Sequence, residues 1–189
     1  MRKLIFILLL TACSSLAFSQ NVGVKTNFAH WATIGSPNVG MEFALNRKFS
    51  LDVVGGFNLW ELGNNRKAKH WLIQPEGRFW FCETFNGHFV GLHGLVGEFN
   101  IGGIDIPIGR LSRFRDYRYE GFAFGAGLSY GYQWIIGSRW NLELSLGAGY
   151  TFLNFDKFEC VRCGDRIGSG TKHYFGITKV SISLIRFIR

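Results

Sequence analysis

Five histidines are the side chains that could most directly support hydrolytic chemistry, because imidazole can act as a base near neutral pH. They are His30, His70, His88, His93 and His173. A hydrolytic site needs a nucleophile, a base and an orienting group within hydrogen-bond reach. No Ser–His pair is recognisable by spacing, and His70 and His173 fall at the ends of expected strands, where a polar ring commonly rests. We therefore predict no catalytic residue.

Cys160 and Cys163 are separated by two residues in a hydrophilic segment near the C-terminus. In an exported protein this spacing predicts a disulfide that staples a loop. A zinc site would need two further ligands, of which His173 is one candidate, and a second cysteine pair is absent from the sequence. A redox-active pair belongs to a βαβ context, which the sequence lacks. We expect the disulfide and neither metal nor cofactor; a metal or redox pair, or free thiols, are the alternatives.

The chain carries a formal net charge of +8, and its basic side chains gather in the longest hydrophilic segments. Interleaved acids make part of this surface a mutually solvated one. Arginine binds phosphate bidentately, however, and Arg113, Arg115 and Arg118 stand among aromatic residues. We expect these three to contact lipid phosphates, as in lipopolysaccharide, or a surface protein partner. No nucleic-acid motif is present, so no nucleic-acid partner is predicted.

The stretch from Gly121 to Leu153 indicates the architecture that positions these residues. Bulky apolar residues alternate with small or polar ones on both sides of the turn Gly137–Arg139. Successive strand side chains point to opposite faces, so each of two strands has one bulky face and one small or polar face. The two runs are longer than an ordinary strand of a soluble protein and have the length of tilted membrane-spanning strands. Aromatic residues lie at both ends of each run, where a bilayer has its interfaces.

We therefore predict an all-β fold, an eight-stranded antiparallel up-and-down transmembrane β-barrel. Its connections alternate between tight turns and long loops, as in outer-membrane barrels with short periplasmic turns. The expected strands lie near 22–34, 38–46, 48–60, 70–82, 86–101, 119–135, 140–155 and 173–188, and the long loops at 61–69, 102–118 and 156–172.

Two strands fit this pattern poorly. Pro75 interrupts the fourth strand, where its missing donor is costly in lipid unless a bulge accommodates it. In the fifth strand bulky residues occupy both alternating positions, which leaves the directions of His88 and His93 open.

A soluble β-sandwich is the main rival fold, but it would place many glycines in strand interiors, where they pack nothing. A lipocalin-like barrel would need bulky residues inside and polar residues outside.

A group of charged residues falls on the inward face of the predicted barrel. Isolated charges in a narrow interior are costly, so we expect them to pair into a polar plug that fills the barrel and fixes its register. A proton or ion path is the alternative, and a wide pore is not expected in so small a barrel. The group comprises Lys25, Glu42, Asp52, Glu76, Arg78, Glu143 and Lys179.

The N-terminus has the features of a cleavable signal peptide over residues 1–19. Arg2 and Lys3 precede an apolar run, and Ala17-Phe18-Ser19 supplies a small-x-small cleavage site. Residues 20–189 would then form a single barrel domain. Leu10-Thr11-Ala12-Cys13 resembles a lipobox, so lipidation of Cys13 is the competing form of processing.

The stretch from His70 to Cys82, followed by Phe85-Asn86-Gly87-His88-Phe89, resembles an uncharacterised family of small Gram-negative outer-membrane proteins. Asp116 to Gly121, Gly131 to Trp134 and Cys160 to Cys163 fit the same family, and the resemblance covers nearly all of the mature chain. It implies an outer-membrane barrel and supplies no activity or catalytic residue.

These observations together predict a monomeric, non-enzymatic barrel in the cell outer membrane, with a structural or surface-interaction role. A narrow transport or small-ligand barrel is the first alternative, favoured if the interior proves open. A lipid-A-modifying enzyme is the second, favoured if a histidine lies beside a serine or an acid at the outer rim.

Overall fold

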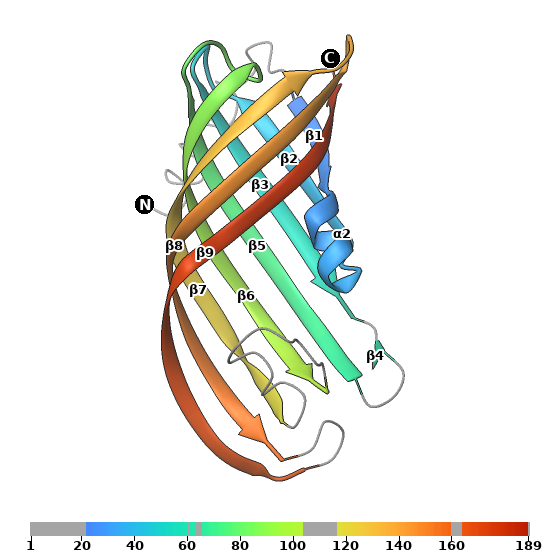
Figure 1. Cartoon of the computed structure of the whole chain (residues 1–189), viewed down its shortest axis with the longest axis vertical. Helices are drawn as coiled ribbons and strands as arrows, with labels where there is room; N and C mark the ends of the chain where they lie inside the picture. The colour runs from blue at the N-terminus through green and yellow to red at the C-terminus, as the bar shows by residue number, and fades with distance from the viewer. Residues whose placement is uncertain (1–21, 60, 63–65, 104–116, 160–163, 189) are drawn as a thin grey trace, which may run out of the picture.

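A computed structural model describes residues 22–59, 61–62, 66–103, 117–159 and 164–188. The predicted signal peptide and Cys13 lie outside these residues. The fold is almost entirely β, with one short helix (Figure 1). Its elements are β1 (Val22–Asn27), α2 (Phe28–Ile34), β2 (Asn38–Ala44), β3 (Phe49–Asn58), β4 (Glu61–Leu62), β5 (Arg66–Trp80), β6 (Gly87–Gly102), β7 (Arg118–Ile135), β8 (Trp140–Phe158) and β9 (Arg166–Ile188).

Among the described residues, eight strands of 6 to 23 residues form one closed antiparallel ring. Each strand pairs with its neighbour along the chain, with β3 passing directly to β5, and β1 pairs with β9 to close the circuit. The two-residue β4 lies against the start of β5. The predicted all-β, eight-stranded, up-and-down arrangement is confirmed, and the strands form one closed sheet where a sandwich would have two.

Side chains alternate around the ring as the sequence pattern predicts. On β7, Phe124, Leu128 and Tyr130 are exposed on the outward face, whereas Ser129 and Gln133 are buried inside. The outward face is therefore apolar and the inward face small or polar, the reverse of a lipocalin. This arrangement gives interior space to polar groups.

The first expected strand, 22–34, is wrong in its second half, where the chain forms α2. The side-chain oxygen of Asn27 accepts a hydrogen bond from the Ala29 amide at 3.0 Å and caps the helix start. Gly35 ends the helix in the left-handed conformation at φ 60°, which glycine adopts without strain. This Asn…Gly pair was the signal in the sequence for a helix. Among the described residues, no helix is long and apolar enough to cross a membrane.

The expected long loops at 61–69 and 156–172 are also largely wrong, because β5 begins at Arg66, β8 continues to Phe158 and β9 begins at Arg166. Pairing between β8 and β9 extends to Phe158↔Arg166. Most of the 102–118 loop lies outside the described residues. These strand ends lie beyond the apolar part of the pattern, so the alternation that revealed the other strands is absent there.

Pro75 is accommodated without a bulge. The β5–β6 register is the same on both sides of it, at Ile73↔Val96 and Glu76↔His93. Pairing to β6 is interrupted only at residues 74 and 75, while Pro75 stays paired with Val53 of β3. The missing N–H of Pro75 is thus accommodated because the β5–β6 pairing is interrupted at that point. A register shift does occur in the β8–β9 ladder, next to Gly147.

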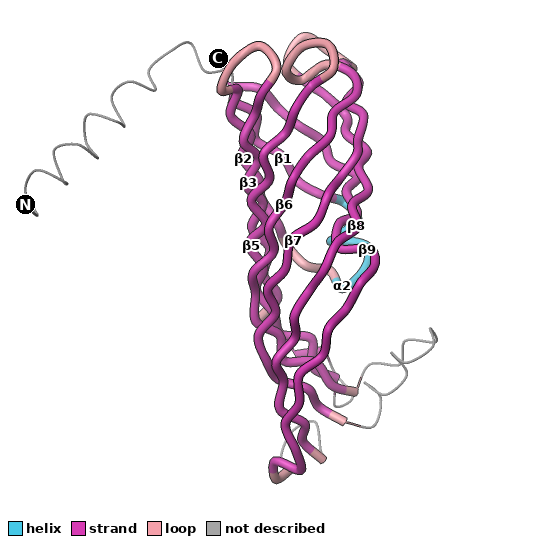
Figure 2. The backbone as a smooth tube through the Cα atoms, turned by 90° about the vertical axis from the view of Figure 1, so that its left-hand side faces the viewer, coloured by secondary structure: helices cyan, strands magenta, loops and turns pink. Residues whose placement is uncertain are grey.

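The strands differ greatly in length, which gives the molecule two unlike halves (Figures 1 and 2). At one end, called here the tight-turn end, the turns 45–48, 81–86 and 136–139 connect the strands, and all eight strands take part in the ring. Toward the opposite end, called here the long-connection end, β1 and β2 stop early and β9 pairs with β8 alone. There β5 to β9 continue as a curved sheet, with α2 beside β9.

Candidate functional site

The structure brings all seven predicted interior charges into one buried cluster, with Arg78 of β5 at its centre. Its guanidinium contacts four carboxylates at once. Nη1 lies 2.9 Å from Glu42 and 2.7 Å from Glu143, Nη2 lies 2.8 Å from Asp52, and Nε lies 2.7 Å from Glu76. The planar fork of five N–H donors lets one side chain serve acids from four strands.

Two lysines complete the cluster from β1 and β9. Lys25 Nζ lies 2.9 Å from Asp52 and 3.2 Å from both Glu42 and Glu143. Lys179 pairs with Glu76 and lies 3.9 Å from Asp52. No side chain in these pairs is more than 4% exposed, so the cluster is sealed from bulk water.

Neutral side chains hold the acids from the other side. Ser50 donates to Glu42 at 2.7 Å, and the Trp80 indole N–H donates to Ser50 at 2.9 Å. Ser129 donates to Glu76. The Arg78 guanidinium also lies 4.4 Å from the centre of the Phe89 ring, a cation–π contact.

An aromatic layer closes the interior at the tight-turn end. The ring centroids of Trp80 and Phe89 lie 4.8 Å apart, and those of Phe85 and Phe187 lie 4.7 Å apart. Phe85 belongs to the turn between β5 and β6 and adopts a φ of 70°, which is unusual for a bulky residue. Burial of its ring inside the sheet stabilises that backbone conformation.

A polar layer beneath α2 lies on the other side of the cluster. Asn38 donates to the carbonyl of Asn27 at 2.9 Å and to that of Ser36 at 3.2 Å. The Asn27 amide donates in turn to the Asn38 side chain at 2.6 Å. The charged cluster therefore lies between an aromatic layer and an amide-rich layer, and packed side chains fill this part of the ring.

Ser36 and His70 meet in this polar layer, a pairing that spacing did not reveal. Ser36 Oγ lies 3.2 Å from His70 Nε2, and His70 Nδ1 lies 3.2 Å from the carbonyl oxygen of Ala68. Because a carbonyl oxygen only accepts, Nδ1 is the donor in the contact with Ala68. Ser36 is 2% exposed, so its hydroxyl is shielded from solvent.

The other histidines divide between the two faces. His93 points inward, with Nε2 at 2.8 Å from Thr178 Oγ1. His88 points outward, and its Nδ1 lies 2.6 Å from the Tyr130 hydroxyl. These contacts settle the two directions that the sequence left open.

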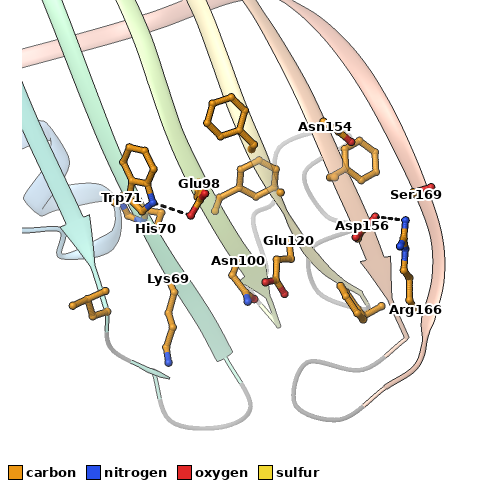
Figure 3. A pocket seen from close by; sticks show the side chains of 16 residues that line it. Lys69, His70, Trp71, Glu98, Asn100, Glu120, Asn154, Asp156, Arg166 and Ser169 are labelled. Carbon is orange, nitrogen blue, oxygen red and sulfur yellow. Dashed lines mark hydrogen bonds and ion pairs between the residues drawn. The ribbon is translucent and has the colours of Figure 1, made fainter. Parts of the chain in front are cut away.

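A groove of about 810 Å³ lies on the outward face of the curved sheet, near the long-connection end. Figure 3 views it with β5 to β9 side by side. The Trp71 indole N–H donates to Glu98 at 2.9 Å, and Arg166 pairs with Asp156 at 2.8 Å. Asn100 also lines the groove, and its side-chain oxygen is buried without a hydrogen-bond partner in the described structure.

Arg118, one of the three predicted phosphate-binding arginines, borders this groove. Its guanidinium lies 4.0 Å from the centre of the Phe158 ring and 3.9 Å from Glu120. Nearby, the Lys157 ammonium lies 3.4 Å from the Tyr117 ring centre. Arg113 and Arg115 lie outside the described residues.

Cys160 and Cys163 also lie outside the described residues, so their expected disulfide stays a prediction. Cys82 is an exposed free thiol just after β5. Within the described ranges, no group of three or more His, Cys, Asp or Glu side chains is placed to hold a metal ion.

Replacing Arg78 by Met should destabilise the protein by about 3–5 kcal/mol, because it leaves buried carboxylates without their central partner. Denaturant unfolding of the refolded protein measures this loss. The matched control is Arg47→Met, since Arg47 is 92% exposed and its pair with Glu83 spans 3.7 Å. That change should cost less than about 1 kcal/mol. Equal losses in the two variants would show that the cluster does not hold the ring.

Comparison with protein families matches residues 4–188 to one family, described as "Protein of unknown function (DUF3575)". Searches of curated proteins and of solved structures each gave no match. The resemblance to an uncharacterised family is thereby confirmed. The family match covers the strands that carry the charged cluster and those that form the groove, and the chain belongs to the DUF3575 family.

Proposed function

We propose that residues 20–189 form a monomeric outer-membrane β-barrel, exported by the signal peptide 1–19, with a non-enzymatic structural or surface-interaction role. One observation carries this proposal: the ring buries its charges and exposes its large apolar side chains. In water, so large an exposed apolar surface would be unfavourable. In a bilayer, the same surface meets lipid, and where the ring is closed each strand is paired on both edges.

The dimensions of the apolar face support the membrane setting. On β7 it runs from Phe122 to Trp134, and on β8 from Trp140 to Phe152. At a rise of ~3.3 Å per residue and a tilt of about 40°, each run has a height of roughly 30 Å, close to the hydrocarbon thickness. Trp134 and Trp140 mark one edge of this band, where aromatic girdles lie in such barrels.

The packed interior favours a role at the surface over transport. Cluster side chains at most 4% exposed leave little room for a solute to pass between the aromatic and amide-rich layers. Narrow eight-stranded barrels are generally filled in this way. Contacts with lipid or with a surface partner are then made by the outward face and the long-connection end.

Leu144→Arg tests the lipid-facing assignment. Leu144 is 50% exposed on the outward face of β8, so the change should cost about 2–4 kcal/mol if it meets the bilayer midplane. Ser145→Ala is the matched control, because Ser145 faces inward and its hydroxyl has no hydrogen-bond partner in the described structure. Urea unfolding from lipid vesicles measures both. Equal tolerance of the two changes would overturn the assignment.

Changing Arg113, Arg115 and Arg118 together to Gln should weaken co-purification of lipopolysaccharide and make it more sensitive to salt. A single ion pair at a protein surface contributes about 1 kcal/mol or less, so the change is made at all three sites. A control triple, Arg47, Lys48 and Arg139 to Gln, removes the same charge at the tight turns, where all three are exposed. If both triples retain the lipid equally at raised salt, the arginines form only a solvated surface.

A lipid-modifying hydrolase is the second candidate, favoured by the contact between Ser36 and His70. Ser36 is shielded from solvent, and His70 is held by the Ala68 carbonyl oxygen. Both observations favour a structural role for the pair. We expect the refolded protein to release no more fatty acid from phospholipid or lipopolysaccharide than its Ser36→Ala variant does. Release that depends on Ser36 would make the hydrolase the better account.

A further inference from the structure

The groove differs chemically from the apolar face that it continues. Two rows of outward side chains lie in it, one across β5 to β8 and the other across β5 to β9, and the strand register aligns each row. One row follows the pairs Trp71↔Glu98, Glu98↔Phe122 and Phe122↔Asn154. The second, two residues farther along, consists of Lys69, Asn100, Glu120, Asp156 and Ser169.

The first row alternates aromatic rings with hydrogen-bonding groups. Trp71 and Phe122 are each 37% exposed, so both rings remain available to a ligand. The Trp71 N–H is already bonded to Glu98, which fixes the indole within the groove. Adjacent strands lie ~4.8 Å apart, so ring and polar group alternate at that interval.

Together the two rows supply acceptors and donors on a nearly neutral surface. The charges of Glu98, Glu120 and Asp156 are balanced by Lys69 and Arg166 in the lining and by Arg118, which lies 3.9 Å from Glu120. Asn100 contributes the side-chain oxygen that lacks a partner. A neutral surface of carboxylates and amides suits a ligand rich in hydroxyl groups better than a phosphate.

We propose that this groove binds the saccharide part of a glycolipid in the same membrane leaflet. Sugar rings present C–H faces that stack on aromatic rings, and hydroxyls that carboxylates and amides bind. The groove begins where the outward apolar face ends, which is the level of the headgroup sugars if that face contacts acyl chains. The inference rests on the proposed membrane setting and deepens it. The rings of Trp71 and Phe122 stack on the sugar faces. The side chains of Glu98, Asn100 and Glu120 bind the hydroxyls, and Arg118 lies beside them.

The test uses the full mature chain, refolded in uncharged detergent micelles, and a core oligosaccharide freed of acyl chains and phosphate. Calorimetric titration should detect binding that changes less than about twofold when salt is raised, because an uncharged ligand releases few counterions. The double variant Trp71→Leu, Glu120→Ala should bind at least tenfold more weakly. The control double variant, Trp140→Leu with Glu83→Ala at the tight-turn end, should bind like the parent.

Absence of oligosaccharide binding, or equal loss in both double variants, overturns the saccharide site. Binding of intact lipopolysaccharide without binding of the oligosaccharide overturns it as well, because the contacts would then be to phosphate or acyl chains. These failures are distinct from failure of the membrane barrel, which is decided by Leu144 and Ser145. Gel migration before and after boiling verifies that each variant is folded, and an unfolded double variant is replaced by Trp71→Phe with Glu120→Gln, which should weaken binding in the same direction.

Discussion

The contact between one guanidinium and four carboxylates is the constraint on which the rest of the structure depends. Glu42, Asp52 and Glu76 are directly paired across β2, β3 and β5, so three negative charges stand side by side on one face. Without a central cation they would repel one another across the sheet. Arg78 joins them to Glu143 on the far side of the ring and so fixes four strands relative to one another. With its charges satisfied inside, the ring can present an apolar exterior.

The direction of most interior side chains could be predicted because a strand has a period of two. That rule predicts that Lys25, Glu42 and Glu143 point inward. It could not pair them, because Lys25 and Glu143 are 118 positions apart and meet only when the ring closes. Pairing depends on register and on the curvature of the whole sheet, neither of which a local pattern contains.

The sequence-based predictions that the structure contradicts also fail for local reasons. The alternation through Val22 to Lys25 predicts a strand that continues past Asn27, although Asn27 and Gly35 mark the two ends of a helix. The sequence predicts loop at the far ends of β8 and β9, because polar residues such as Lys172 occur there and the apolar alternation has ended. The groove has no sequence motif at all: Trp71, Glu98 and Phe122 come from three strands and are neighbours only through register.

Asn27 lies at the point where β1 ends and the ring of paired strands is no longer closed. Its side chain donates to the Val180 carbonyl at 3.0 Å and accepts from the Ile182 amide at 3.0 Å, while it also caps α2. One amide thus takes over the partners that a longer β1 would have offered to β9. Closing β1 against β9 joins the two ends of the described chain, the contact with the largest loop entropy to overcome. Asn27 therefore ends that closure. It sets the number of residue pairs between β1 and β9, and with that number the level along the molecule at which the ring ceases to be closed.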